Sequence, residues 1–249
     1  MPVVHDPSGG RRLLDAAGAT IARFEQAVRD GRPTADLFAR EPGVTVDDAA
    51  AAVLADLRGW RIAGDEELGR ALVAAGGTPM RHGHMYSRNL KADPPPRTWD
   101  EPPGIRLTDI DRPIADLLAA RRAAYAPDHP DRAFIPEDDE AELRDVVYGG
   151  QLGPLLVGSG LAVAADGAVV GAIILGTIPG DPPKNGPWVI DIFRAPGHRG
   201  VGRALLQRAL ALATVDALGL IVTDGNDAAR ALYESQRFVL LASALVVQL

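Results

Sequence analysis

The sequence predicts a folded protein of the α/β or α+β class, and three observations support this prediction. Its 249 residues are 47% hydrophobic and 24% charged, as in ordinary globular proteins. A proline-rich segment divides the chain into two parts. After that segment, several apolar strands precede a strand, a glycine loop, a helix, a strand, a helix and a strand, an order that is typical of α/β and α+β enzymes.

The dividing segment spans residues 91–104 and contains five prolines in fourteen residues. Proline continues neither a helix nor a central strand, so this composition predicts a semi-rigid, extended linker. We therefore expect a helix-rich N-terminal domain at residues 1–90 and a second domain at residues 105–249.

Helical spacing of apolar residues dominates the first domain. It predicts one helix from Leu13 to Val28 and another from Val46 to Leu57, where Asp47 and Asp48 in the first turn suit the helix dipole. The other elements expected here are a short strand at 60–62, a helix at 65–75 that Gly76 and Gly77 end, and an extended segment at 79–90.

Short strands and helices alternate in the second domain. Asp166 and Gly167 lie between two apolar runs and predict a tight hairpin, because these residues accept the positive φ of such a turn. In chain order we expect a strand at 105–107, helices at 112–125 and 137–147, hairpin strands at 161–165 and 168–178, a strand at 188–194, a helix at 200–218, a strand at 218–222, a helix at 227–235 and a strand at 239–249.

Composition also excludes several classes of function. The chain has no cysteine, which excludes a disulfide scaffold, a thiolate zinc site, an iron–sulfur cluster and a cysteine nucleophile. Its net charge of −7 does not favour binding to nucleic acid or to anionic lipid. No apolar run approaches the ~18–20 residues of a membrane span, and the N-terminus lacks the apolar region of a signal peptide. We therefore expect a cytoplasmic protein with no nucleic acid and no membrane as partner.

The glycine loop after the strand at 188–194 is the most informative segment. It contains Gly197, Gly200 and Gly202, and a helix is expected to begin there. Unpaired N–H groups at a helix N-terminus, together with the helix dipole, attract phosphate oxygens. Arg199 and Arg203 would add positive charge to such a site.

Several interpretations of this loop compete. A Walker P-loop requires a lysine that is absent here, and a Rossmann fingerprint requires Gly or Ala where Leu205 stands. The pyrophosphate loop of an acetyl-CoA enzyme is a third interpretation, and a plain helix-starting turn is a fourth. The loop taken alone leaves these alternatives open.

The segment at 220–238 contains a recognisable pattern made of Val222, Asn226, Ala229, Leu232, Tyr233, Glu234 and Phe238. This pattern resembles the second signature of the GCN5-related N-acetyltransferase (GNAT) superfamily, although Arg237 stands where glycine is usual. The stretch at 200–206 is similar to the family's Gly-x-Gly helix start. The resemblance covers residues 103–249 and implies the GNAT fold, a mixed and mostly antiparallel sheet flanked by helices.

The resemblance also implies acetyl-CoA as cosubstrate. The strands at 188–194 and 218–222 would splay apart, and pantetheine would pair with backbone groups of the first. The family usually carries Arg or Gln three residues before the first glycine of the pair, where this chain has Gly197, so the loop is shortened or Arg194 or Arg199 takes that role. The cofactor-binding residues implied are Ile192, Phe193, Arg194, His198, Arg199, Gly200, Val201, Gly202, Arg203 and Asn226, the last of which we also expect to cap a helix.

Catalytic roles follow by the same resemblance. Tyr233 matches the tyrosine that serves as general acid, and its unperturbed pKa of about 10 suits return of a proton to a thiolate. Asp191 lies beside the expected thioester and is the candidate base, because burial would raise its pKa. The loop that usually shapes the acceptor pocket contains Tyr125, Asp128 and His129, which are candidate substrate residues.

The N-terminal part resembles a degenerate first acetyltransferase half. Arg70-Ala-Leu72 recurs as Arg230-Ala-Leu232 at an offset of 160, each on a helix that follows a short strand. In the first copy Val73 replaces Tyr233, and no Gly-x-Gly loop precedes it. Tandem arrangements of this kind occur in the superfamily.

The resulting functional hypothesis is an N-acetyltransferase that transfers an acetyl group directly to a primary amine of a small molecule. Six of the seven net negative charges follow residue 100, which favours a cationic amine. The alternatives are a catalytically silent acyl-CoA-binding or scaffold protein and, less directly, a nicotinamide oxidoreductase. No metal is expected, because His82 and His84 have no evident third ligand. The sequence is compatible with a homodimer but does not decide the oligomeric state.

Overall fold

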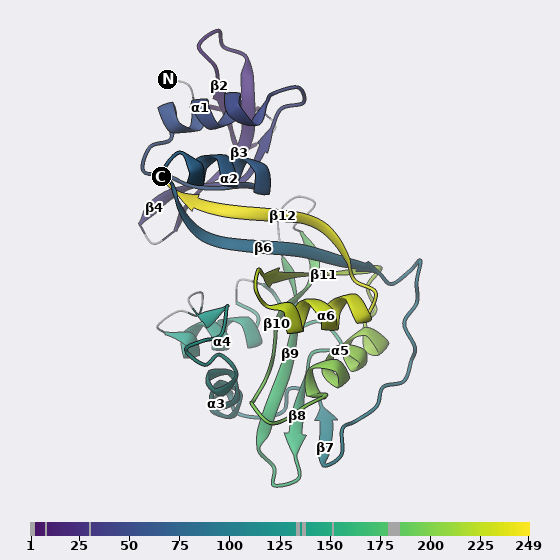
Figure 1. Cartoon of the computed structure of the whole chain (residues 1–249). Helices are drawn as coiled ribbons and strands as arrows, with labels where there is room; N and C mark the ends of the chain where they lie inside the picture. The colour runs from purple at the N-terminus through teal and green to yellow at the C-terminus, as the bar shows by residue number, and fades with distance from the viewer. Residues whose placement is uncertain are drawn as a thin grey trace. The chain divides into compact units, whose positions relative to one another are not determined.

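The computed structural model describes residues 3–7, 9–29, 31–132, 135, 138–150, 152–178 and 185–249. The chain forms two compact units. Unit 1 comprises Met1–Met85 and Leu241–Leu249, and unit 2 comprises Tyr86–Leu240. The chain passes from unit 1 to unit 2 within β6 (Thr78–Asn89) and returns within β12 (Val239–Gln248) (Figure 1).

This division differs from the predicted boundaries in two places. The proline-rich segment at 91–104 belongs to unit 2, because it is held there by specific contacts: Arg97 Nη1 donates to the carbonyl oxygen of Ala211 at 2.9 Å, and Trp99 packs against the core of unit 2. The last nine residues belong to unit 1, because β12 pairs antiparallel with β5 (Arg61–Asp65).

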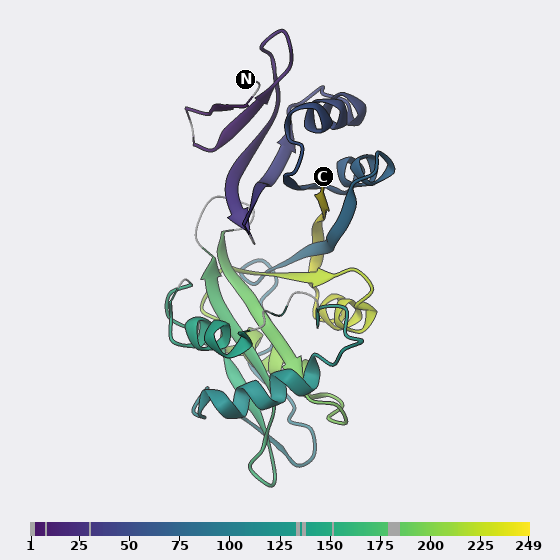
Figure 2. The same ribbon diagram turned by 90° about the vertical axis from the view of Figure 1, so that its left-hand side faces the viewer.

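Unit 1 is built mostly from strands, so the prediction of a helix-rich N-terminal domain was wrong. Its helices pack on one side of the strands (Figure 2). Antiparallel pairing joins neighbouring strands from β1 to β4, and β4 runs parallel to β5. The elements of unit 1 not yet given are β1 (Val3–His5), β2 (Arg11–Leu14), β3 (Thr20–Arg29), β4 (Arg32–Arg40), α1 (Val46–Asp56) and α2 (Glu66–Ala74).

The segment that was expected to form the first helix is a β-hairpin. Asp15 turns the chain between β2 and β3, since its Oδ1 accepts from the backbone N–H groups of Ala17 at 2.9 Å and Ala19 at 2.8 Å. Gly18 has a φ of 84°, which glycine adopts without strain. The alanines at helical spacing therefore lie in a turn, where a side chain bonded to local backbone outweighs helix propensity.

Unit 2 contains a mixed sheet flanked by helices, as the sequence predicts. The strand order is β6-β11-β10-β9-β8-β7. The pairs β7–β8, β8–β9 and β9–β10 are antiparallel, and β10 runs parallel to β11. The predicted start of the second helix at Glu137 lies outside the described residues. The elements are β7 (Ile105–Thr108), α3 (Ile114–Ala124), α4 (Asp139–Val147), β8 (Gly160–Ala164), β9 (Val169–Ile178), β10 (Gly186–Arg194), α5 (Val201–Leu212), β11 (Ala217–Thr223) and α6 (Asp227–Ser235).

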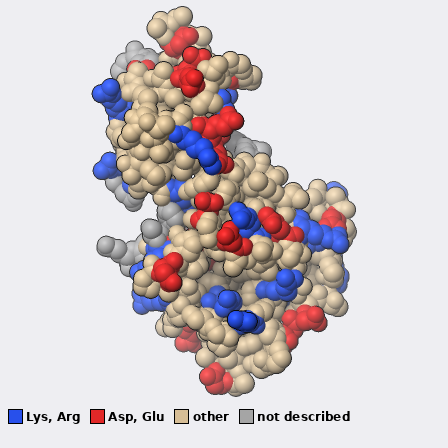
Figure 3. All heavy atoms as spheres, in the orientation of Figure 1, with Lys and Arg blue, Asp and Glu red and all other residues tan. Residues whose placement is uncertain are grey.

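Two hydrophobic cores lie on the two faces of this sheet. Along β9, Ile173 and Leu175 join the core under α5, whereas Ala172 and Ile174 join the core under α3 and α4. The alternation follows from the two-residue period of a strand. Helices α3 and α4 consequently lie on the opposite side of these strands from α5 (Figure 1). On the face of unit 2 in view, acidic and basic side chains are interspersed (Figure 3).

The two units share a succession of elements. In unit 1, β3, β4, α1, β5, α2 and β6 follow one another, and in unit 2, β9, β10, α5, β11, α6 and β12 do so. In both successions the first two strands pair antiparallel (β3 with β4, β9 with β10). The helix that follows (α1 or α5) connects two parallel strands, β4 and β5 in unit 1 and β10 and β11 in unit 2. The repeated Arg-Ala-Leu residues lie on α2 and α6, which are equivalent helices in this comparison. The topology thus agrees with the interpretation of unit 1 as a first half.

Arg237 follows the C-cap of α6 and has a left-handed conformation with a φ of 61°, which explains why glycine suits this position. Such a φ costs a residue other than glycine about 1–2 kcal/mol. Its guanidinium forms an ion pair of 2.6 Å with Asp93. The exposed pair offsets only part of that strain.

Replacing Arg237 separates the two effects. Arg237→Gly and Arg237→Ala both remove the ion pair, but only glycine relieves the left-handed strain. We expect the glycine variant to be more stable than the alanine variant by about 1 kcal/mol in urea unfolding. Equal stability of the two variants would show that the backbone at this position carries no strain.

Candidate active site

Strands β10 and β11 diverge early. Their parallel ladder has a single paired position, Trp188 with Gly219, whereas β10 stays paired with β9 as far as Arg194. The glycine is required because a Cβ at position 219 would lie 2.8 Å from the indole Cε2 of Trp188. Beyond Trp188, the edge of β10 that faces β11 can offer N–H and C=O groups to an extended ligand.

A β-bulge in β10 aims Asp191 at α3. The register with β9 shifts between Val189 and Asp191, which inserts one extra residue. Arg121 Nε donates to Oδ2 of Asp191 at 2.9 Å, and the Tyr125 hydroxyl donates to Oδ1 at 2.6 Å. Burial raises the pKa of Asp191, while the hydrogen bonds and the charge of Arg121 oppose that rise.

These contacts bear on the predicted role of Asp191. Both carboxylate oxygens already accept a hydrogen bond, so Asp191 holds Tyr125 in place and neutralises Arg121. Arg121 also pairs with Glu142 of α4 at 2.8 Å. The sequence analysis did not identify Arg121, since an arginine on an alanine-rich helix gives no signal of its long-range partner.

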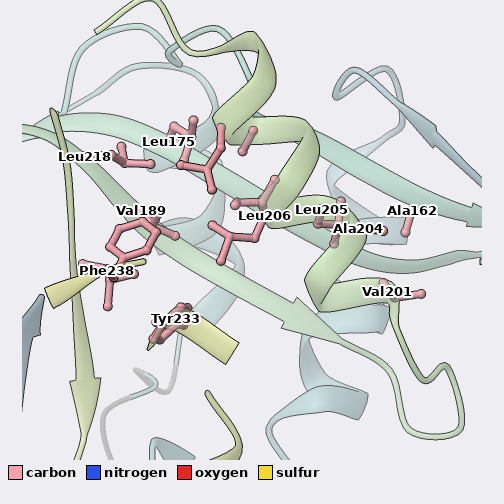
Figure 4. Close-up of a cluster of buried hydrophobic side chains, with 14 of the residues drawn as sticks. Ala162, Leu175, Val189, Val201, Ala204, Leu205, Leu206, Leu218, Tyr233 and Phe238 are labelled. Carbon is pink, nitrogen blue, oxygen red and sulfur yellow. The ribbon is translucent and has the colours of Figure 1, made fainter. Parts of the chain in front are cut away.

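Tyr233 lies on α6 and is 6% exposed. Its ring packs against Phe238 with a centroid separation of 6.1 Å, at the edge of the core under α5 (Figure 4). Burial raises the pKa of the Tyr233 hydroxyl well above its ordinary value, and the negative charges of Asp191 and Asp131 raise it further. Tyr233 therefore keeps its proton at neutral pH and can donate it.

The loop between α3 and α4 brings a carboxylate to α6. Asp131 accepts a hydrogen bond from Oγ1 of Thr223 at the end of β11 and one of 3.3 Å from Nδ2 of Asn226. Asn226 also caps α6, as expected, because its Oδ1 accepts from the N–H of Ala229 at 3.2 Å. Sequence reasoning missed Asp131, although it identified the loop.

The predicted substrate residues of this loop have different surroundings. Tyr125 is bonded to Asp191, and burial raises the pKa of its hydroxyl well above the ordinary range. His129 packs edge-on against the Tyr125 ring with centroids 4.8 Å apart. Asp128 is exposed to solvent.

The N-terminus of α5 has unpaired N–H groups. Gly200 precedes the helix with a φ of 84° and provides no side-chain cap, and the first turn contains no acidic residue. Within the described part of the chain, the N–H groups of Gly202 and Arg203 donate to no backbone carbonyl. Arg199 and Arg203 are exposed beside them. This helix end can therefore accept an anion.

The equivalent helix of unit 1, α1, has no comparable anion site at its N-terminus. The side chain of Thr45 caps α1 by accepting from the N–H of Asp48 at 3.1 Å. Asp47 and Asp48 place two negative charges in the first turn. An incoming phosphate would be repelled there, and one of the N–H groups that it needs is already bonded.

Residues 115–238 match the model of the acetyltransferase (GNAT) family. These residues belong to the GNAT family. No curated protein sequence matches the chain.

Solved structures share the fold over both units. A GCN5-related N-acetyltransferase from Sphaerobacter thermophilus has a TM-score of 0.61 and 15% identity over 96% of this chain and 80% of its own. A tandem GNAT protein from the clavulanic acid biosynthesis pathway has a TM-score of 0.54 and 16% identity over 97% and 82%. A functionally unknown protein from Staphylococcus epidermidis has a TM-score of 0.53 and 14% identity over 90% and 93%. The fold of the tandem protein fits the suggestion that unit 1 is a degenerate first half.

In the GNAT domain, the predicted cofactor residues lie along β10 and the start of α5. Phe193 and Val201 are buried in the cores, so they can contribute only backbone groups, and Ile192 is half-buried. Arg194 is exposed and His198 is half-buried. Gly171 lets α5 begin close to the sheet, because a Cβ there would lie 2.8 Å from both the Phe193 oxygen and a Val201 methyl.

The histidine pair of β6 lies outside the GNAT match. The rings of His82 and His84 are 4.7 Å apart, and His84 Nδ1 lies 2.8 Å from Oγ of Ser243. Nε2 of His82 is 3.7 Å from Oε2 of Glu66. Separately, none of the described helices has the length and apolar character needed to cross a membrane.

The raised pKa of Tyr233 predicts its behaviour in alkaline solution. The hydroxyl ionises near pH ~10 in the unfolded chain but only at higher pH in the folded protein. Its contribution to stability is therefore fully present below about pH 10 and is lost as the pH rises further. We expect native Tyr233→Phe and native wild type to show equal tyrosinate absorbance at about pH 10.5.

The same variant provides the control. After unfolding in guanidinium at that pH, the absorbance of wild type should exceed that of Tyr233→Phe by one tyrosine. The unfolding free energy of the variant should also decline less steeply with pH. A native wild type that already absorbs one tyrosinate more than the variant would contradict the burial argument.

Proposed function

We propose that this protein is an acetyl-CoA-dependent N-acetyltransferase that acts directly on a primary amine of a small molecule. The observation that carries the proposal is the joint placement of the uncapped α5 N-terminus, the unpaired edge of β10 and the proton-bearing Tyr233 within one GNAT domain. Together these groups can hold an anion, an extended amide chain and a leaving thiolate.

The residues at β10 and α5 fit acetyl-CoA. The N–H groups of Gly202 and Arg203 are suited to the pyrophosphate, and Arg199 or Arg203 can add charge. The backbone of Ile192–Arg194 along the unpaired edge can bond the amides of pantetheine, as a peptide adds to a sheet. The cosubstrate would supply the acyl group as a thioester, whose transfer to an amine leaves a thiolate.

Tyr233 is proposed to protonate that thiolate. Its buried hydroxyl holds a proton at neutral pH, and a thiolate that forms in the same buried, acidic surroundings also has a raised pKa, so the thiolate accepts a proton more readily than it would in water. Asp191 is the proposed acceptor of the proton that the amine loses. The proton would pass either through the Tyr125 hydroxyl, which is bonded to Asp191, or directly to Asp191 once that hydrogen bond is broken. A cysteine-linked acyl intermediate is excluded by composition, so direct attack by the amine is the simplest route.

A catalytically silent acyl-CoA-binding protein is the second candidate. The observation that favours it is the occupied carboxylate of Asp191, whose two oxygens are bonded to Arg121 and Tyr125. Such a protein would bind acetyl-CoA but release no free CoA with any amine. The two candidates thus share the cofactor site and differ in turnover.

Free CoA is easily measured here because the protein contributes no thiol of its own. We expect acetyl-CoA to raise the melting temperature and a panel of primary amines to release CoA, detected by a thiol reagent. Tyr233→Phe should lower kcat by about 10²–10⁴ because it removes the proton donor. The variant should keep most of the thermal shift, since the ring stays in place.

The outcomes separate the candidates. A thermal shift without turnover on any amine would favour the silent protein. If millimolar acetyl-CoA did not raise the melting temperature, both candidate functions would be contradicted. Tyr233→Phe with unchanged kcat would remove the tyrosine from the mechanism.

A further inference from the structure

Asp131 joins three segments of unit 2. It lies on the loop after α3, it accepts from Thr223 at the end of β11, and it accepts from Asn226 at the start of α6. Thr223 is buried, whereas the Asp131 side chain is 23% exposed. The carboxylate is therefore held in a fixed place and remains accessible to a ligand.

The charge of Asp131 is less compensated than that of the neighbouring acids. Asp191 and Glu142 pair with Arg121, and Asp139 pairs with Arg122. The two side-chain donors to Asp131 are a hydroxyl and an amide, which are neutral. Neutral donors hold a carboxylate in position without cancelling its charge.

His129 does not supply the missing positive charge in this arrangement. Its Nδ1 lies 3.7 Å from Oδ2 of Asp131, but the same nitrogen accepts the backbone N–H of Asp131 at 3.1 Å. A ring nitrogen that accepts a hydrogen bond has no proton to donate, so Nδ1 of His129 does not donate to the carboxylate in this geometry. Among the described residues, no arginine or lysine forms an ion pair with Asp131; His129 is the basic residue beside it.

Asp131 also lies near the proposed reacting groups. Its negative charge contributes to the raised pKa of both Tyr233 and Tyr125. Tyr233 comes from α6, and Tyr125 comes from the end of α3. The carboxylate is therefore within electrostatic range of both tyrosine hydroxyls.

We infer that Asp131 binds a positively charged group of the acceptor, so that the acceptor is a small amine with a second group that is cationic at neutral pH. This inference rests on the proposed function. The nitrogen that is acetylated must lose its proton before it attacks, whereas a fixed carboxylate is best satisfied by a cation that stays charged throughout. Asp131 is thus a specificity-determining residue for the second charge.

The experiment compares amines that differ only at the far end. The probes are 1,5-diaminopentane, 1-aminopentane and 5-aminopentanoate, whose far ends are cationic, neutral and anionic. We expect wild type to use the diamine with a kcat/KM about tenfold above that of the monoamine, mainly through KM, and the anionic probe least well.

Asp131→Asn keeps the size of the side chain and one acceptor oxygen for Thr223, but it removes the charge. We expect it to lose most of the tenfold preference. Thr223→Val removes a hydrogen bond and keeps the charge, so the preference should persist even if the melting temperature falls. Asp116→Asn, an exposed acid on α3, is the matched control for net charge and should also keep the preference.

The results distinguish this inference from the proposed function. An unchanged preference in Asp131→Asn, or a wild type with no preference for the diamine, would overturn the role of Asp131. Acetylation of the monoamine but not of the diamine would also overturn it, whereas failure to acetylate any of the probes would reject the proposed function. Loss of the acetyl-CoA shift itself would instead reject the proposed function.

Discussion

The early divergence of β10 from β11 is the constraint on which the rest of unit 2 depends. The two parallel strands pair only at Trp188 and Gly219, where the indole occupies the space of a missing Cβ. Beyond that point β10 keeps only β9 as a partner, and its bulge turns Asp191 towards α3. The divergence leaves the edge of β10 free, and the bulge against β9 turns Asp191 towards Arg121 and Tyr125.

The two halves of the chain show how the same topology acquires or loses a site. Both place a helix between two parallel strands. In unit 2 a glycine precedes that helix, and the N–H groups of Gly202 and Arg203 have no backbone partner among the described residues, whereas in unit 1 Thr45 caps the helix and its first turn contains two acids. A side-chain cap and acids in the first turn stabilise a helix by about 1 kcal/mol or more, so unit 1 has the better helix start and unit 2 the better anion site.

The sequence predicted most of unit 2 because its signals are local. Asn226 before an amphipathic helix predicted a cap, and Asp166 with Gly167 predicted a hairpin. Helix α6 begins and ends at the expected residues. In unit 1 the local signal misled, because the alanines at 16–19 have helical spacing but Asp15 bonds them into a turn.

The candidate site was predictable only in part for the same reason. Tyr233 was found through a motif of adjacent residues. Asp131 and Arg121 act through partners 92 and 70 residues away, Thr223 and Asp191, and no periodicity along the chain reports such contacts. The bulge that orients Asp191 is also invisible, because it depends on the register with β9.

The stoichiometry of CoA binding tests the central claim most directly. If the uncapped start of α5 is the pyrophosphate site and the capped start of α1 is closed, calorimetric titration should give one CoA per chain. Arg203→Asp, which puts an acid into the first turn of α5 as in α1, should then weaken binding about tenfold. Two CoA molecules per chain, or unchanged affinity in Arg203→Asp, would contradict this account.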